Sequence, residues 1–162
     1  MYRTLGTVSA LLITLALSGC EVVNRYVNAR QSMKSAAAAL ASETQLPDAY
    51  TIVRAAHSFK QYGDAIAEAS SDAGTIARDL DRAPREDQLK LRQIFNPQDR
   101  DALDAEISGV QGFVDRLRHA CAAGTGSSQA EAACVSSERE ALRMQESEAM
   151  LKAAYALILN KI

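Results

Sequence analysis

Tryptophan is absent from the 162 residues, proline occurs three times, and aromatic residues make up only 5% of the chain. β-Branched residues are also few, whereas alanine is abundant along the whole sequence. Alanine favours helices, and β-branched and aromatic residues favour strands. The composition therefore predicts an all-α protein and argues against a fold rich in β-strands.

Motifs that would identify an enzyme or a cofactor site are also missing. The sequence has no Gly-x-Ser-x-Gly, no Cys-x-x-Cys-His, and no P-loop lysine after its glycine-rich stretch at 124–127. The two histidines, His57 and His119, lie off the apolar stripes of different predicted helices, so they predict neither a haem nor a di-metal site. We expect no cofactor and no enzyme; catalysis by Glu148 with nearby polar groups is the alternative.

An apolar run, Leu5 to Leu17, follows Arg3 and ends in Leu17-Ser18-Gly19-Cys20. Its thirteen residues are too few to cross a bilayer, which needs about 20. The tetrapeptide resembles the lipobox of bacterial lipoproteins, in which the thiol of the last residue is lipidated and the chain is cut just before it. An uncleaved anchor or an ordinary secretory signal is the alternative, and both put the rest of the chain on the same side.

The resemblance implies a signal peptide over 1–19 and a mature domain over 20–162. Cys20 would carry a diacylglyceryl group and an N-acyl chain, and two or three acyl chains anchor a protein stably in a membrane. Loss of Arg3 leaves 17 of the 18 basic residues against 20 acidic ones, a net charge of −3. Because nucleic-acid binding requires clustered Lys and Arg, we expect no nucleic-acid partner.

The residue after Cys20 is Glu21 and not the Asp that resembles an inner-membrane retention signal in enteric lipoproteins. The resemblance therefore favours the outer membrane, with the protein facing the periplasm. The inner membrane, or the outer face of a Gram-positive membrane, remains an alternative.

Export leaves two further cysteines, Cys121 and Cys134, in an oxidising compartment. They lie on either side of the glycine-rich stretch at 124–127, at positions that come opposite each other across a helical hairpin. We predict that they form a disulfide. A zinc site with His119 is the rival, but it lacks a fourth ligand at a familiar spacing, so we expect no metal.

Four apolar stripes with helical spacing predict an antiparallel four-helix bundle. Residues 83–96 predict a short extra helix that connects the second and third long helices across one end. The stripes that define the first, third and fourth long helices are Val22, Tyr26, Ala29, Met33, Ala36 and Leu40; Leu103, Ile107, Val110, Val114, Leu117 and Cys121; and Cys134, Ser137, Ala141, Met144, Glu148, Leu151, Tyr155, Ile158 and Ile162.

The second long helix has a heptad pattern in which one seam position is large and the other is small. Large residues interdigitate over small ones, so we expect an antiparallel neighbour to approach closely, with its backbone near Gly63. The large positions are Ile52, Phe59, Ile66, Ala73 and Leu80, and the small ones are Ala49, Ala56, Gly63, Ser70 and Ala77.

Local signals place the helix starts and the solvated faces. Pro47 suits the first turn of the second helix, Asn96 the N-cap of the third, and Ser128 with Glu131 a capping box for the fourth. Charged residues away from the stripes predict solvated faces, and the two arginines among them are candidates to contact anionic lipid head groups. They are Arg25, Arg30 and Lys34 on the first helix, and Asp64, Glu68 and Asp72 on the second.

Glu148 is the one ionisable residue in the last stripe, which makes it a candidate buried polar site. From Ala149 onward the helix is apolar almost all round, so we expect enclosure within the bundle, or contact with a second protein or the acyl boundary. We expect a membrane-anchored helical module that acts by protein contact, as an accessory, immunity or exclusion factor of the envelope. The protein partner is unknown, and the alternative is a bundle that binds a small apolar ligand.

Overall fold

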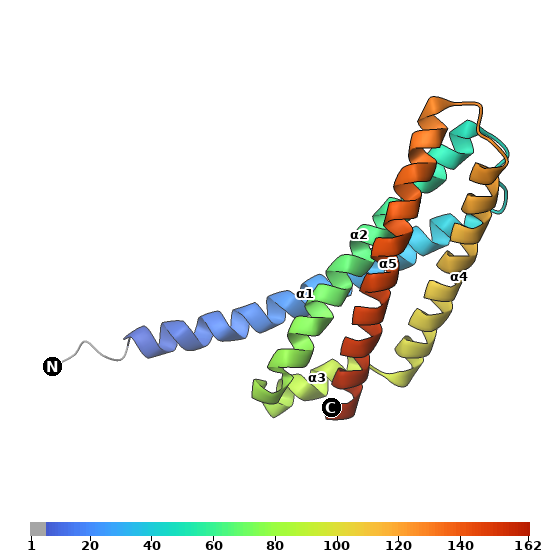
Figure 1. Ribbon diagram of the computed structural model, residues 1–162. Helices are drawn as coiled ribbons and strands as arrows, with labels where there is room; N and C mark the ends of the chain where they lie inside the picture. The colour runs from blue at the N-terminus through green and yellow to red at the C-terminus, as the bar shows by residue number, and fades with distance from the viewer. Residues whose placement is uncertain (1–5) are drawn as a thin grey trace.

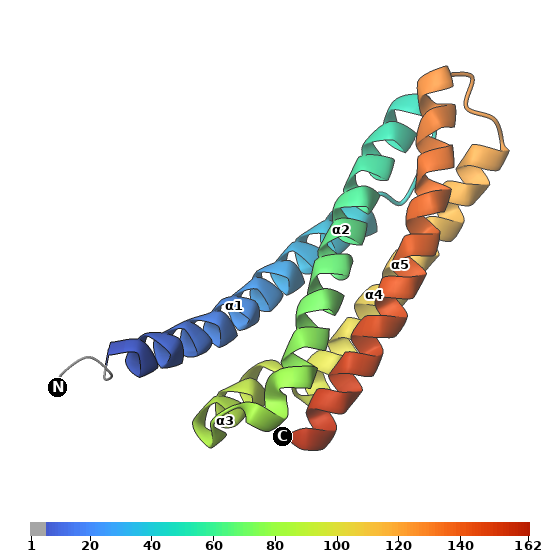
Figure 2. The ribbon, with the colours of Figure 1, turned by 60° about the vertical axis from the view of Figure 1, so that its left-hand side comes forward.

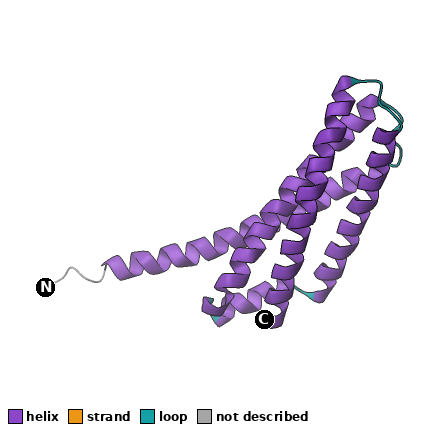
Figure 3. Cartoon of the chain, viewed as in Figure 1, coloured by secondary structure: helices purple, strands orange, loops and turns teal. Residues whose placement is uncertain are grey.

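The computed structural model describes the backbone of residues 6–162 and the side chains of residues 21–162. This part of the chain is helical, with short connections and no strand (Figure 3). The prediction of an all-α bundle is confirmed. The helices are α1 (Gly6–Ser42), α2 (Ala49–Asp79), a 3-10 turn η1 (Leu80–Arg82), α3 (Arg85–Ile94), α4 (Pro97–Ala122) and α5 (Ser128–Lys161).

The proposed signal peptide, residues 1–19, and the side chain of Cys20 lie outside the described side chains. The boundary between a signal and a mature domain therefore stays a prediction. Within the described part of the chain, no helix combines the length and the hydropathy that a membrane crossing requires.

The four long helices alternate in direction along the chain, and the short helix α3 crosses one end of the bundle, as predicted (Figure 1). The long α1 packs on one side of α2, and its first turns project beyond the bundle (Figure 2). The antiparallel pair α4 and α5 is bridged by Arg118 to Glu138 at 2.8 Å and by Lys152 to Asp104 at 3.1 Å.

The small seam of α2 faces a parallel neighbour, α5, and not the antiparallel one that the sequence predicts. Arg143 pairs with Asp64, and Lys161 Nζ lies 2.7 Å from Asp81. Residue numbers therefore rise in the same direction along both helices, which makes them parallel. The prediction was wrong because hairpin arguments relate only helices that are consecutive in the chain. Small residues on both α2 and α5 permit this closer, non-consecutive contact.

The predicted stripes form the core. The large heptad positions of α2 are at most 3% exposed, and the α1, α4 and α5 stripes are buried apart from residues near the helix ends and Glu148. Burying one such large apolar side chain contributes about 1.5–3 kcal/mol. The hydrophobic pattern therefore accounts for how the helices are rotated about their own axes.

Each long helix after α1 begins at a side-chain cap. Asp48 caps α2 and accepts a hydrogen bond from the Thr51 N–H at 2.8 Å, while Pro47 lies just before the cap. Asn96 caps α4, as predicted. The cap of α5 is Ser127 and not Ser128, because the extended residue that precedes the helix is one position earlier.

A disulfide joins Cys121 to Cys134, whose Cα atoms are 6.0 Å apart, across the turn between α4 and α5. It closes a loop with a sequence separation of 13 residues. Constraining a loop of that length in the unfolded chain stabilises the fold by on the order of 3 kcal/mol.

Gly63 lies beneath a side chain of α5. A Cβ atom at this position would lie 2.6 Å from Cδ of Glu140 and would collide with its Oε1 atom. The group that lies close to Gly63 is therefore the Glu140 carboxylate, and not the helix backbone that the sequence predicts. The side chain of Glu140 is 12% exposed, and burial raises the pKa of its carboxyl group.

Stability measurements on a double-mutant cycle test this contact. In a Glu140→Ala background, Gly63→Ala should raise the free energy of unfolding by about 0.5–1 kcal/mol, because alanine is the better helix former. In the wild-type background the gain should vanish or reverse, because the added Cβ displaces the Glu140 carboxylate. Urea titration gives both values.

Gly74 provides the matched control, since it is also within α2 but has open space where a Cβ would stand. Gly74→Ala should give the same gain in both backgrounds. Equal effects of Gly63→Ala with and without Glu140 would contradict the contact.

Candidate functional site

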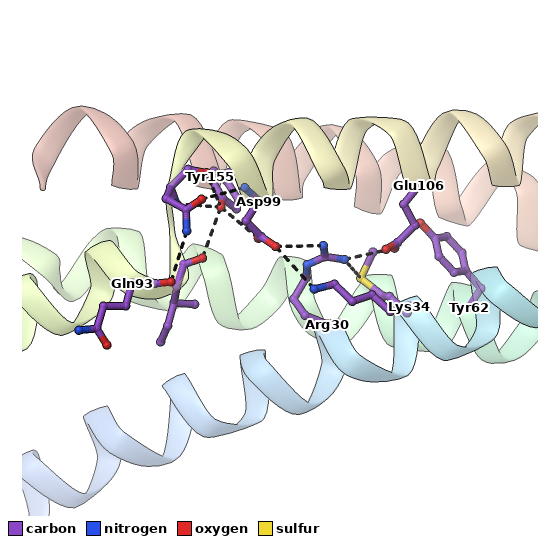
Figure 4. A network of polar contacts seen from close by, with 10 residues as sticks. Arg30, Lys34, Tyr62, Gln93, Asp99, Glu106 and Tyr155 are labelled. Carbon is purple, nitrogen blue, oxygen red and sulfur yellow. Dashed lines mark hydrogen bonds and ion pairs between the residues drawn. The ribbon is translucent and has the colours of Figure 1, made fainter.

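A network of polar contacts is centred on Arg30 of α1, whose side chain is 6% exposed (Figure 4). Its Nη1 atom donates to Glu106 Oε1 at 3.2 Å and lies 3.7 Å from Met33 Sδ. Its Nη2 atom is 3.8 Å from Asp99 Oδ1. The prediction of a solvated Arg30 was wrong, because two carboxylates of α4 compensate its charge inside the bundle.

Glu106 is the buried acid of this cluster, with 11% of its side chain exposed. The hydroxyl of Tyr62 donates to its Oε1 atom at 3.4 Å. Burial raises the pKa of Glu106, and the positive charge of Arg30 opposes that rise. Tyr62 comes from α2, so this half of the cluster connects α1, α2 and α4.

Asp99 continues the network toward α5. Its Oδ2 atom accepts from the Tyr155 hydroxyl at 3.1 Å, and its Oδ1 atom lies 3.7 Å from Lys34 Nζ (Figure 4). The backbone N–H of Asn96 donates to the same tyrosine oxygen at 3.2 Å. Polar contacts thus join α1, α4, α5 and the turn that precedes α4.

Aromatic packing covers this half of the network. The ring of Phe95 stacks on Tyr26 with centroids 4.6 Å apart and meets Tyr155 edge-on at 5.1 Å. The Tyr26 hydroxyl and the Nε and Nη2 atoms of Arg30 are buried without a hydrogen-bond partner in the described part of the chain. Burial raises the pKa of Tyr26, Tyr62 and Tyr155, so the hydroxyls stay neutral at ordinary pH. Such a network fixes how the helices are oriented relative to one another.

A second charged residue that we predicted on an outer face is also buried. Asp72 of α2 is 4% exposed, and Arg25 Nη2 donates to its Oδ1 atom at 2.8 Å. Asp64 of the same row does face solvent, where it pairs with Lys60 and Arg143. The row is therefore split between a helix-to-helix contact and the surface.

Glu148 lies at the edge of the contact between α4 and α5, with 14% of its side chain exposed. Lys152 Nζ is 3.0 Å from its Oε1 atom, and Gln111 Nε2 donates to its Oε2 atom at 3.0 Å. The structure therefore supplies this carboxylate with a cation and an amide donor, and does not place it among the direct contacts of Arg30.

The disulfide uses both thiols of the rival zinc site. Among the side chains that the structure describes, no three His, Cys, Asp or Glu residues come close enough together to hold a metal ion. The lipidation residue, Cys20, lies outside the described side chains.

Two hollows in the described part of the molecule bear on ligand binding. One, beside the disulfide and Phe59, has a volume of about 10 Å³, which is room for no more than one water. The other is an open groove of about 220 Å³ between α4 and α5. Its walls combine apolar and charged side chains, namely Arg100, Leu103, Asp104, Lys152, Tyr155, Ala156, Leu159 and Asn160.

The surface of α5 carries a row of exposed large apolar side chains, which we call the α5 apolar face. Val135, Leu142, Met150 and Leu157 are 56, 65, 54 and 54% exposed. Their spacings of 7, 8 and 7 residues keep them on one side of the helix over about 33 Å. The apolar segment that starts at Ala149 is thus only half enclosed by the bundle.

The chain matches no known family model, no curated protein and no solved structure.

The raised pKa of Glu106 predicts how stability depends on pH. The folded chain holds this proton to a higher pH than the unfolded chain, whose glutamate pKa is about 4.3. The stabilisation that the protonated Glu106 contributes to the folded state is fully present below that value and is lost as the pH rises through the folded pKa. From pH 4 to 7, wild type should therefore lose stability relative to Glu106→Gln, as urea titration at each pH will measure.

Glu138→Gln is the control of opposite sign, because Arg118 lowers the pKa of Glu138. Relative to that variant, wild type should gain stability over the same pH range. Parallel curves for wild type and Glu106→Gln would contradict the assignment.

Proposed function

We propose that this protein is a lipid-anchored lipoprotein of the bacterial envelope that binds another protein through the α5 apolar face. The resemblance of Leu17-Ser18-Gly19-Cys20 to a lipobox supports the anchor. The Cys121–Cys134 disulfide supports an oxidising compartment, since such bonds form and persist outside the cytoplasm. Glu21 after the proposed lipid site favours the outer membrane with the bundle in the periplasm.

The α5 apolar face carries the interaction half of this proposal. Its four large apolar side chains are more than half exposed and share one side of the helix, and apolar side chains gathered on a surface are typical of interaction sites. Arg139 and Glu146 lie on the same side by helical spacing and would give a partner charged contacts between the apolar ones. A helical groove or a second helix on the partner would match this surface.

The open groove between α4 and α5 is the feature that favours the alternative, a small apolar ligand. At about 220 Å³ it is smaller than the roughly 300 Å³ at which ligand pockets usually begin. Lys152 pairs with Asp104 and Glu148 at its wall, which makes the lining partly ionic. We therefore favour a protein as the partner.

Replacing the proposed lipid site tests the anchor. Cys20→Ser should abolish labelling by radioactive or alkyne fatty acid and leave the signal uncleaved, because the acyl acceptor is a thiol. The measurement is labelling and fractionation of cells that express each form, with Cys121→Ser as the cysteine control. Continued labelling of Cys20→Ser would exclude this anchor.

Substitutions on α5 test the interaction surface. Leu142→Glu should reduce in-cell crosslinking to the dominant partner about 30-fold, because losing a central apolar anchor costs about 2 kcal/mol. Mass spectrometry of the captured proteins gives the ratio to wild type. Tyr50→Glu is the matched control, since Tyr50 is an exposed large side chain of α2, 71% exposed, and is not part of the α5 apolar face.

Unchanged capture by Leu142→Glu and Leu157→Glu would reject this face as the interaction site. If wild type captured no protein above background, the ligand alternative would be preferred, and the purified protein would be analysed for bound lipid.

A further inference from the structure

The bundle end that contains α3 is held close to the residue that we propose is lipidated. Tyr26 stacks on Phe95, which directly follows α3, and Arg25 pairs with Asp72 of α2. Tyr26 lies six positions after Cys20 in one continuous helix, a rise of about 9 Å. With acyl chains at Cys20 in the bilayer, this end of the bundle reaches the depth of the head groups.

This end also carries arginines that lack a carboxylate partner. The nearby acids are occupied by lysines: Glu86 and Asp87 pair with Lys90 at 3.3 and 3.4 Å, and Asp81 pairs with Lys161 at 2.7 Å. Asp79 is the exception, since the described residues give it no ion pair. The exposed arginines at this end that form no ion pair in residues 21–162 are Arg78, Arg82, Arg85 and Arg92.

The outer face of α3 combines two of these arginines with an apolar side chain. Arg85, Leu89 and Arg92 are spaced by four and three residues, so they share one side of the helix. Leu89 is 52% exposed, whereas Leu91, on the inner side, is 6% exposed. Gln88 Nε2 donates to the carbonyl oxygens of Leu80 and Ala83 at 3.2 and 3.1 Å, which fixes the inner side against the bundle.

We propose that α3 lies on the membrane and binds anionic phospholipids, with Leu89 entering the boundary between head groups and acyl chains. The planar guanidinium groups of Arg85 and Arg92 match phosphate oxygens in pairs of hydrogen bonds. Arg82 adds charge at the same end, and basic residues at a membrane surface favour anionic lipid. This proposal rests on the lipid anchor proposed above.

The absence of tryptophan in the chain allows a single fluorescent reporter. Acylated mature protein that carries Leu89→Trp is bound to vesicles of phosphatidylcholine and phosphatidylglycerol with brominated acyl chains. Its emission should fall by about half relative to unbrominated vesicles, because an interfacial apolar side chain lies 5–10 Å deep. The same measurement with Val135→Trp, at the other end of α5, should show no loss.

Charge reversal distinguishes binding of anionic lipid by the α3 arginines from mere closeness of α3 to the membrane. Arg85→Glu with Arg92→Glu should abolish the quenching of the Leu89→Trp reporter, as should vesicles of phosphatidylcholine alone. Arg54→Glu with Arg116→Glu changes the net charge equally, at exposed arginines of α2 and α4 outside the α5 apolar face, and should leave the quenching intact. Circular dichroism confirms that each variant is folded.

Protein that floats with vesicles but shows the same loss of emission in brominated vesicles for Leu89→Trp and Val135→Trp would overturn the α3 proposal and leave the anchor standing. Quenching that survives the α3 charge reversal would also overturn it, as it would assign the position of α3 to the anchor alone. Protein that does not float at all would overturn both proposals.

Discussion

The positive charge of Arg30 is buried where α1 meets α4, and much of the arrangement around it serves to compensate that charge. Removing one partner from a buried ion pair typically costs about 3–5 kcal/mol, although the intact pair adds little net stability. The buried ion pairs of Arg30 therefore contribute mainly by fixing the relative position of the helices. Glu106 and Asp99 bond to Arg30 only when α4 has one rotation and one height relative to α1.

The network matters most for α4 because this helix has fewer close backbone contacts than the α1, α2 and α5 layer. Close packing through alanine, serine and glycine holds α2 between α1 and α5. Ion pairs, the disulfide and the Arg30 cluster hold α4 against them. One side of the bundle is thus specified by the shape of small residues, and the other by charge and a covalent link.

Apolar periodicity in the sequence was sufficient to predict the helices, their buried faces and the short α3, since each depends on residues close together in the chain. Arg30 was missed although it lies four residues after Tyr26 and three before Met33, a spacing that places it on the buried stripe. Glu106 lies three residues after Leu103 and four before Val110, which also places it beside a buried stripe. Burial of such a charge depends on the helix that faces it, which single-helix patterns do not contain. The parallel contact of α2 with α5 escaped prediction for the same reason.

The uninterrupted α1 has a consequence for the orientation of the whole molecule. A lipoprotein with a flexible linker turns freely about its acyl chains, whereas here a helix connects position 20 directly to the first core residue, Tyr26. Each residue inserted between them would rotate the attachment point by about 100° around the helix axis and lift the body by 1.5 Å. If Cys20 carries the anchor proposed above, the helical residues 21–25 set the direction in which α5 faces along the membrane.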